Sequence, residues 1–485
     1  MKIDDLTKRS LIISFVLCGM YVLPLVIANS YYIDDLGRAI TGSGWDQDGR
    51  ILSSFIMRFI SLGVPISDIF PFNLIIACIL IIVPLSLMFS RDKKRSILSV
   101  SILPLLFITS PFFLENLSYR YDSIPMALSV SAVALPFIFI NNRSNFALCS
   151  VIGIVISLLT YQSTATSYFI LLALFLLRDV KEGDYIEFVK RSAVGALAFV
   201  IAVILSKLAW HFGDFDMRGR DTLIFSEAEP LKLLRNNFIE YINLLSRVMK
   251  SWYVITLIPI IALFVFSYYL YIKRSCVRTP RLNIAGTILS LIILICVFLC
   301  SIGANLILSS PWWTPRTMVG YAFLLTFIAF FVIDNTPNRR PIVICASITI
   351  AYSFMLSANY GNALRIHDEF NDKIASLIYP YISESDGVQI AIDGIIPEPK
   401  RLNLMKEKIP MIHTLVPTYI NNSVSWGPTY FKQYDMIKVD SWLSGSDRIK
   451  VIADKCSLPV VYSNKFFTLR MKNKLSIIDF KKDKC

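Results

Sequence analysis

The chain has 485 residues, of which 55% are hydrophobic and only 17% are charged, and its mean hydropathy is +0.59. Because a soluble domain carries about 25% charged residues, this composition excludes an ordinary soluble enzyme and predicts an integral membrane protein. The net charge of +13 does not indicate nucleic acid. The basic residues lie in short loops between apolar runs, where the positive-inside rule puts them, and no recognition motif accompanies them.

Apolar stretches recur along the chain, and most approach the roughly 20 residues that a helix needs to cross a bilayer. They predict a polytopic α-helical membrane protein with about eleven transmembrane helices. The predicted spans are residues 11–29, 70–90, 97–113, 124–140, 146–161, 165–178, 193–210, 254–273, 283–307, 317–333 and 341–358.

The charges between these stretches predict the orientation. Basic residues occur at the N-terminus and in every second connection, as at 91–95 and 339–340. Placing these connections in the cytoplasm satisfies the positive-inside rule throughout and leaves the C-terminal region outside. The other segments that then face outward are 30–69, 114–123, 162–164, 211–253 and 308–316.

The first outward segment contains an amphipathic stretch at residues 51–69. Arg58 and the run Gly63-Val64-Pro65 interrupt its apolar residues. We predict a helix that lies on the outer leaflet or dips into it, because a twelfth span would invert every later loop.

The composition changes near residue 359, which separates a predicted membrane domain, 1–358, from a C-terminal domain, 359–485. Charged residues become frequent in this second part, and Pro and Gly separate short β-like runs. A water-exposed mixed α/β domain is therefore predicted. Its strand-like runs are residues 388–392, 458–462 and 466–470.

Two of the nine cysteines, Cys456 and Cys485, lie in this polar region, whereas the others lie in or beside apolar runs. If the region is outside the cytoplasm, these two are candidates for a disulfide. The sequence alone leaves their pairing open.

The densest cluster of candidate site residues follows the first span. Carboxylates there can act as a general base toward an attacking hydroxyl, and arginines can hold a phosphate through a planar fork of donors. Trp45 adds a flat apolar face of the kind that holds a sugar ring. The alternative is a solvated loop whose charges pair with one another. The cluster consists of Asp34, Asp35, Arg38, Trp45, Asp46, Asp48, Arg50 and, further along, Arg58.

A second cluster, Glu115, Arg120 and Asp122, occupies the short outward connection at 114–123. Ionisable groups near the apolar zone are costly and tend to be functional. The alternative is an interfacial anchor in which Tyr119 and Tyr121 belong to an aromatic belt. Asp122 is the more diagnostic residue, because a belt does not need a carboxylate.

Weaker signals lie on the same predicted side. Gln162, after Tyr161, can donate to a sugar hydroxyl, although helix-end polarity explains it equally well. Trp312 and Trp313 fit an aromatic belt, which leaves Arg316 to meet a lipid phosphate.

Several catalytic signatures are missing from the sequence. Its three histidines have no paired spacing, and it contains no phosphate-cradling glycine loop and no nucleophile elbow. A pre-activated, lipid-linked donor would meet the need for energy outside the cytoplasm.

The runs YYIDDLGR at 31–38 and GWDQDGR at 44–50 resemble the opening of the bacterial and phage serotype-converting O-antigen glucosyltransferases of the Gtr type. LSYRYDSIPMALS at 117–129 and TYQSTATSY at 160–168 are also similar to family segments. The likeness extends over most of the membrane region and is weak in the C-terminal region.

The resemblance implies a GT-C-like membrane enzyme of the bacterial inner membrane. It would take glucose from undecaprenyl-phosphate glucose and pass it to a sugar of the lipopolysaccharide O-antigen on the periplasmic face. A donor synthase and a donor flippase would be its partners. The family's acidic residue after the first span maps to Asp34 or Asp35, and a second acidic position maps to Asp122.

These expectations share one mechanism, in which an arginine stabilises the leaving phosphate. Arg50, Arg58, Arg120 and Arg316 are its candidates. Whether Asp34, Asp35 and Asp122 also hold a divalent cation stays open. The alternative functions are a flippase or transporter of a lipid-linked saccharide, and an O-antigen polymerase or ligase.

Overall fold

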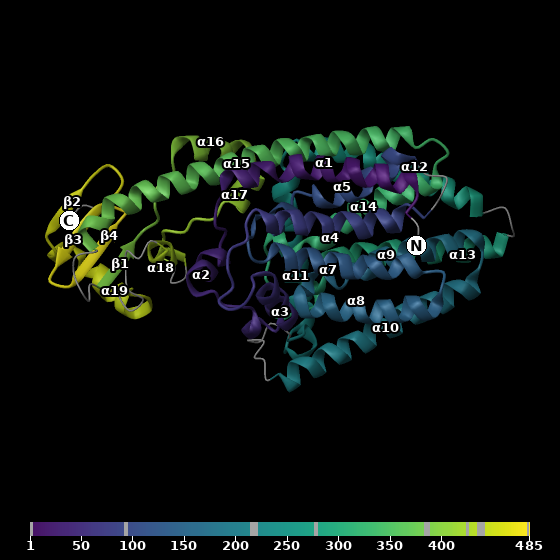
Figure 1. Cartoon of the computed structure of the whole chain (residues 1–485), viewed down its shortest axis with the longest axis horizontal. Helices are drawn as coiled ribbons and strands as arrows, with labels where there is room; N and C mark the ends of the chain where they lie inside the picture. The colour runs from purple at the N-terminus through teal and green to yellow at the C-terminus, as the bar shows by residue number, and fades with distance from the viewer. Residues whose placement is uncertain are drawn as a thin grey trace. The chain divides into compact units, whose positions relative to one another are not determined.

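The computed structural model describes residues 3–91, 96–213, 222–275, 280–382, 389–422, 426–433, 442–482 and 485. The described chain is mostly helical, with a small sheet near its C-terminus (Figure 1). It forms two compact units. We call Met1–Pro24, Gly44–Gly63 and Ile69–Ala358 the membrane unit, and Leu25–Ser43, Val64–Asp68 and Asn359–Cys485 the C-terminal unit.

Each predicted span falls mainly on one α-helix. These helices are α1 (Asp5–Ala28), α4 (Phe72–Phe89), α5 (Ile97–Ile108), α7 (Ser123–Ala134), α8 (Arg143–Thr160), α9 (Ser167–Glu182), α10 (Tyr185–Phe212), α12 (Tyr253–Ser275), α13 (Pro280–Ile302), α14 (Val319–Asn335) and α15 (Arg340–Ile382). Helix α15 continues well beyond the predicted end of the last span, at residue 358, into the C-terminal unit.

Within the described residues, eight helices are long and apolar enough to cross a membrane. The predicted spans at 97–113, 124–140 and 317–333 fall on shorter apolar helices. The chain is therefore a polytopic membrane protein, and the count of eleven spans stays a prediction.

Shorter helices occupy the predicted outward segments. Helix α3 (Ile51–Ile60) covers most of the amphipathic stretch, α6 (Phe113–Ser118) begins the second cluster, and α11 (Pro230–Met249) lies within 211–253. Residues 214–221 of that last segment are outside the described residues.

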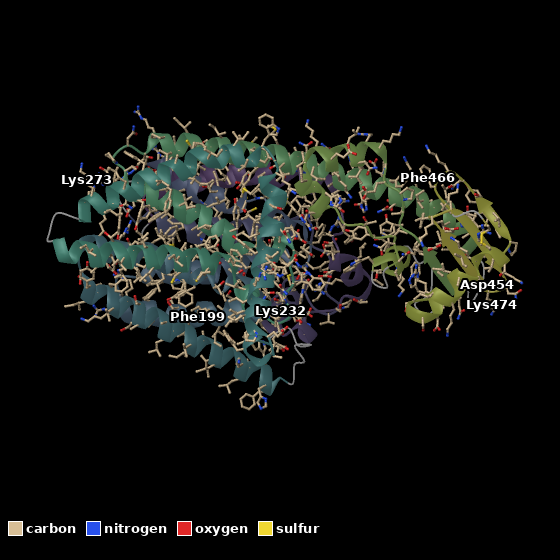
Figure 2. All side chains as sticks on the ribbon, turned by 180° about the vertical axis from the view of Figure 1, so that it is seen from behind. Phe199, Lys232, Lys273, Asp454, Phe466 and Lys474 are labelled. Carbon is tan, nitrogen blue, oxygen red and sulfur yellow. A yellow bond between two sulfur atoms is a disulfide. The ribbon has the colours of Figure 1, made fainter. Side chains whose placement is uncertain are left out.

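The membrane unit exposes apolar side chains along its helices, such as Ile12, Val16 and Leu23 of α1. Figure 2 shows the side chains of both units, with Phe199 on α10 and the charged Asp454 and Lys474 in the C-terminal unit. An apolar exterior of this extent is unusual for a protein in water and suits contact with lipid.

Small residues bring membrane helices close together. A Cβ atom on Gly153 of α8 would lie 2.1 Å from the carbonyl oxygen of Ala132 in α7. One on Gly320 of α14 would lie 2.4 Å from the carbonyl oxygen of Ser301 in α13. Such close backbone approach is typical of helix packing in membranes, where small residues line the contact.

The sheet of the C-terminal unit contains β1 (Gln389–Asp393), β2 (Val460–Ser463), β3 (Thr468–Lys472) and β4 (Leu475–Asp479), in the order β1-β4-β3-β2. β1 and β4 are parallel, and the other pairs are antiparallel. The three predicted strand-like runs overlap β1, β2 and β3, although Val388 is outside the described residues. Strand β4 was not predicted, because only Asn473 and Lys474 separate it from β3.

Among its described residues, this unit also contains the short helices α16 (Lys400–Lys408), α17 (Pro410–Leu415), α18 (Trp426–Lys432) and α19 (Gly445–Ala453). Its core also includes Leu36 of α2 (Asp34–Thr41), a helix from the first outward segment. The segment that carries Asp34 and Asp35 thus folds with residues more than 300 positions later in the chain.

Two features secure the end of the chain. Cys456 and Cys485 form a disulfide with 5.4 Å between their Cα atoms. The Lys455 ammonium lies 2.7 Å from Asp393 and 3.1 Å from Asp479, at the carboxyl ends of β1 and β4. Burial raises the pKa of Asp393, but hydrogen bonds from Lys455 and Lys481 outweigh it and hold this pKa below its ordinary value of 3.8.

Candidate functional site

The membrane unit joins the two sequence clusters through Trp45 and Asp122. Trp45 precedes a short 3-10 turn, Asp46–Asp48, and its backbone N–H donates to the Ser54 hydroxyl at 2.7 Å. Its indole Nε1 donates to Asp122 Oδ1, also at 2.7 Å. Both side chains are buried, with 1% of Trp45 and 2% of Asp122 exposed. This burial leaves Trp45 little surface for the sugar ring that we expected it to hold.

Arg50 lies between Asp122 and the end of α8. Its Nη1 is 3.5 Å from Asp122 Oδ1, and its Nε donates to Gln162 Oε1 at 3.3 Å. Its guanidinium also lies over the ring of Tyr161, 5.1 Å from the centroid. A carboxylate, an amide and an aromatic face therefore fix the plane of this arginine.

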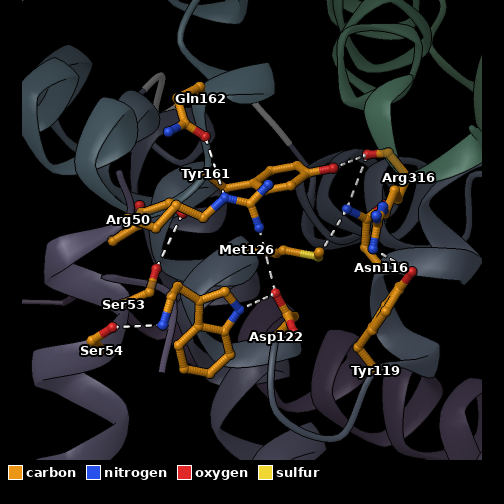
Figure 3. Close-up of polar contacts among 12 residues, drawn as sticks. Arg50, Ser53, Ser54, Asn116, Tyr119, Asp122, Met126, Tyr161, Gln162 and Arg316 are labelled. Atoms are coloured by element: carbon orange, nitrogen blue, oxygen red, sulfur yellow. Dashed lines mark hydrogen bonds and ion pairs between the residues drawn. The ribbon is translucent and has the colours of Figure 1, made fainter. Parts of the chain in front are cut away.

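A second arginine, Arg316, is fixed on the far side of Tyr161 (Figure 3). Its backbone N–H donates to Glu115 Oε2 at 2.6 Å. Its guanidinium donates to the Tyr119 hydroxyl and lies over that ring, 4.9 Å from the centroid. Its carbonyl oxygen accepts from the Tyr161 hydroxyl at 2.8 Å and from Asn116 Nδ2 at 3.1 Å.

Tyr161 thus links the two arginines, because its ring contacts Arg50 and its hydroxyl binds the backbone of Arg316. Only 1% of this tyrosine is exposed, so the link lies within the packed part of the unit. Two planar, permanently charged guanidinium groups held in this way suit the recognition of a phosphate.

The other predicted residues of the membrane unit lie around this network. Arg58 pairs with Asp46 at 2.6 Å, in a contact that is partly exposed, and Asp48 is partly buried. Arg120 is 6% exposed and lies over the ring of Phe70 at 4.4 Å.

The aromatic residues divide into exposed and buried groups. Trp312 is 62% exposed, whereas Trp313 is partly buried and contacts Tyr241 edge-on at 6.4 Å. Tyr119 and Tyr121 are at most 2% exposed, which does not fit the belt alternative for the second cluster.

Asp34, Asp35 and Arg38 belong to α2 and therefore to the C-terminal unit. The Asp35 carboxylate is fully buried and accepts from the backbone N–H of Tyr32 at 3.2 Å. Asp34 and Arg38 are partly exposed. Of the two carboxylates, Asp34 is therefore the more exposed.

The first sequence cluster is thus divided between the two units, and so are the three carboxylates that we considered for a divalent cation. Among the described residues, no group of three or more His, Cys, Asp or Glu side chains gathers around a point that would suit a metal ion. Asp122 Oδ1 already accepts from Trp45 and Arg50. A divalent cation held by these three carboxylates therefore stays a prediction.

The sequence analysis did not single out Ser54, Asn73 or Asn116 as site residues. Asn73 Nδ2 donates to the Ser123 hydroxyl at 2.9 Å and to the carbonyl oxygen of Tyr119 at 3.4 Å, which supports the second cluster from α4. A signal was present, since Asn73 is a polar residue at the start of an apolar span.

Comparisons with known proteins identify the family of this chain. A model of the family described as "Glucosyl transferase GtrII" matches residues 23–327, more than half of the chain. A protein of Salmonella phage P22, described as a 55.3 kDa protein in the gtrB 5' region, is 24% identical over 424 residues. That match covers 84% of this chain and 86% of the relative.

No solved structure matches the chain. The family match includes α2, α3, the Trp45–Asp122 contact, Tyr161 and Arg316. The resemblance found in the opening motifs is thus confirmed over most of the membrane region, and the chain belongs to the glucosyl transferase GtrII family.

Proposed function

We propose that this protein transfers a glucosyl residue from undecaprenyl-phosphate glucose to a sugar of the lipopolysaccharide O-antigen, on the periplasmic face of the inner membrane. The family supports the glucosyl group and the enzyme class. The observation that carries the donor assignment is the pair of arginines held by Tyr161 in a unit of membrane helices. A polyprenyl phosphate offers both a lipid tail and a phosphate for such a site.

In the proposed step, a hydroxyl oxygen of the acceptor attacks the anomeric carbon of the glucosyl group. The bond between that carbon and the phosphate oxygen breaks, and undecaprenyl phosphate leaves with the bonding electrons. Arg50 and Arg316 would stabilise the charge that develops on the phosphate. This role needs no protonation of the leaving group, because a phosphomonoester is a good leaving group.

The proton of the attacking hydroxyl goes to a carboxylate, for which we propose Asp34. Its partial exposure supports this choice over Asp35, which is buried and bound to backbone. The proposed role of Asp122 is to hold Trp45 and Arg50, since its Oδ1 accepts from both.

Two observations support a periplasmic site. The basic connections alternate along the chain in the pattern expected for an N-terminus in the cytoplasm. The disulfide between Cys456 and Cys485 fits an oxidising compartment. If the donor is made at the cytoplasmic face, it must also be moved across the membrane, so the proposal includes a donor synthase and a donor flippase as partners.

The test is glucose transfer by purified protein in vesicles that contain undecaprenyl-phosphate glucose and lipid-linked O-antigen. The compared proteins are wild type, Asp34→Asn and Asp35→Asn, at equal amounts of folded protein. We expect Asp34→Asn to lose transfer while it stays folded, and Asp35→Asn to lower the yield of folded protein. Normal transfer by Asp34→Asn would contradict its role. Absence of transfer by the wild type would direct attention to saccharide transport instead.

A further inference from the structure

The turn that leads into α2 has an unusual backbone. Ile33 immediately precedes Asp34 and adopts φ 48° and ψ −102°. With the bond from Asp35 N–H to the Tyr32 carbonyl, at 3.0 Å, this is the geometry of a type II′ turn. Glycine dominates at this position, and a β-branched residue with positive φ is a genuine outlier.

One side chain of the C-terminal segment bridges this turn. The Tyr419 hydroxyl accepts from the Ile33 N–H at 3.2 Å and donates to the Tyr31 carbonyl oxygen at 3.0 Å. It therefore binds the backbone on both sides of Tyr32. The Tyr32 hydroxyl in turn donates to the Leu415 carbonyl oxygen at 2.8 Å, four residues before Tyr419.

Tyr419 is itself fixed by its surroundings. It is 1% exposed, its ring stacks on Tyr430 at 5.9 Å, and the ring of buried His367 lies 5.3 Å away. Burial, and next the negative charge of Asp368, raise the pKa of Tyr419 well above its usual range. The hydroxyl therefore stays protonated and keeps its donor role toward Tyr31.

We propose that Tyr419 is a positioning residue for glucosyl transfer, which holds the strained turn at Ile33 and thereby orients Asp34 at the start of α2. This inference rests on the proposed function of Asp34. Strained backbone persists where the surroundings over-determine it, and it clusters at functional sites. The C-terminal segment is then part of the catalytic apparatus, and a C-terminal segment exchanged from a relative must supply an equivalent hydroxyl.

The test compares Tyr419→Phe with Tyr430→Phe in the full-length protein. The control removes a ring hydroxyl from the same core. That hydroxyl donates to Asp372 Oδ1 at 2.5 Å, whereas the Tyr419 hydroxyl binds the backbone of the turn. We expect Tyr419→Phe to lower kcat about 10- to 100-fold with little change in KM, because Asp34 would be displaced from its position for the reaction. Tyr430→Phe should change kcat less than 3-fold. Equal kcat losses in the two variants would overturn the proposal.

A second variant separates positioning from general loss of stability. Glycine adopts the φ of Ile33 without strain, so Ile33→Gly should restore part of the kcat lost in Tyr419→Phe. We expect at least a 3-fold recovery in the double variant. A further loss, as for two independent destabilising changes, would contradict the proposal.

Hydrogen exchange of the peptide that contains Ile33 tests the same inference without a transfer assay. Tyr419→Phe should speed exchange of this peptide at least 10-fold, and Tyr430→Phe should not. If the wild type transfers no glucose but exchange responds as expected, the proposed function fails while Tyr419 still holds the turn. Unchanged exchange would refute the contact itself.

Discussion

The contact between Trp45 and Asp122 yields the sharpest quantitative prediction. Asp122→Asn keeps the shape of the side chain but removes the charge that accepts from the Trp45 indole at 2.7 Å. A buried hydrogen bond to a charged group contributes about 1.5–3 kcal/mol. The Arg50 contact to the same oxygen is longer, at 3.5 Å, so we assign most of the effect to the indole bond.

If this carboxylate orients Arg50 for the transition state, a loss of about 2–3 kcal/mol lowers kcat/KM roughly 30- to 150-fold. The assay is glucose transfer from undecaprenyl-phosphate glucose, with folded protein quantified by size-exclusion chromatography. Trp45→Phe removes the donor of the same hydrogen bond and should lower kcat/KM by a smaller factor, because Asp122 keeps its charge.

The double variant tests whether the two side chains act through one contact. If they do, Trp45→Phe should cost little more in the Asp122→Asn background than Asp122→Asn costs alone, and the two effects will not add. Fully additive losses would refute this reasoning, as would an Asp122→Asn enzyme within 3-fold of wild type.

The remaining predictions concern stability. Cys485→Ser opens a loop of 29 residues and should lower the unfolding free energy of the C-terminal unit by about 3 kcal/mol, measured by thermal unfolding; an unchanged midpoint would contradict this. The pKa of Asp393 is lowered in the folded protein, so its carboxylate stabilises the fold above its ordinary pKa of 3.8, and this contribution is lost as the pH falls through the lower folded value. An Asp393→Asn variant should therefore be less stable than the wild type at pH 7, and the difference should be smaller at pH 3. Gly153→Ala should reduce the yield of folded protein, since its Cβ would lie 2.1 Å from the Ala132 carbonyl oxygen, whereas Gly19→Ala has open space and should not; equal yields would count against the tight packing of α7 and α8.

Much of the fold could be predicted from hydropathy, because each membrane helix is formed by a long apolar run. Such a run is recognisable even where it contains single polar residues. Every predicted span falls mainly on one α-helix. Boundaries were less accurate where structure continues through a polar segment, as α15 does beyond residue 358. Strand β4 was missed because a two-residue connection leaves no visible loop between it and β3.

The site was only partly predictable, for a physical reason. Local clusters of charge identified Arg50 and Asp122 as candidates, and Arg316 stood out as an arginine beside two tryptophans. Tyr161 links these residues, but it lies 155 positions before Arg316 in the sequence. A contact between residues so far apart leaves no local pattern from which it could be predicted. The turn at Ile33 was hidden for the opposite reason, since a β-branched residue predicts extended backbone, and a tertiary contact with Tyr419 overrides that preference.

The most direct test of the central claim is the identity of the donor. Purified wild-type protein would be given either labelled undecaprenyl-phosphate glucose or labelled UDP-glucose, with the same lipid-linked O-antigen. The account predicts that label moves to the acceptor only from the polyprenyl phosphate, and that the product includes free undecaprenyl phosphate. Transfer from UDP-glucose alone, or from neither donor, would contradict it.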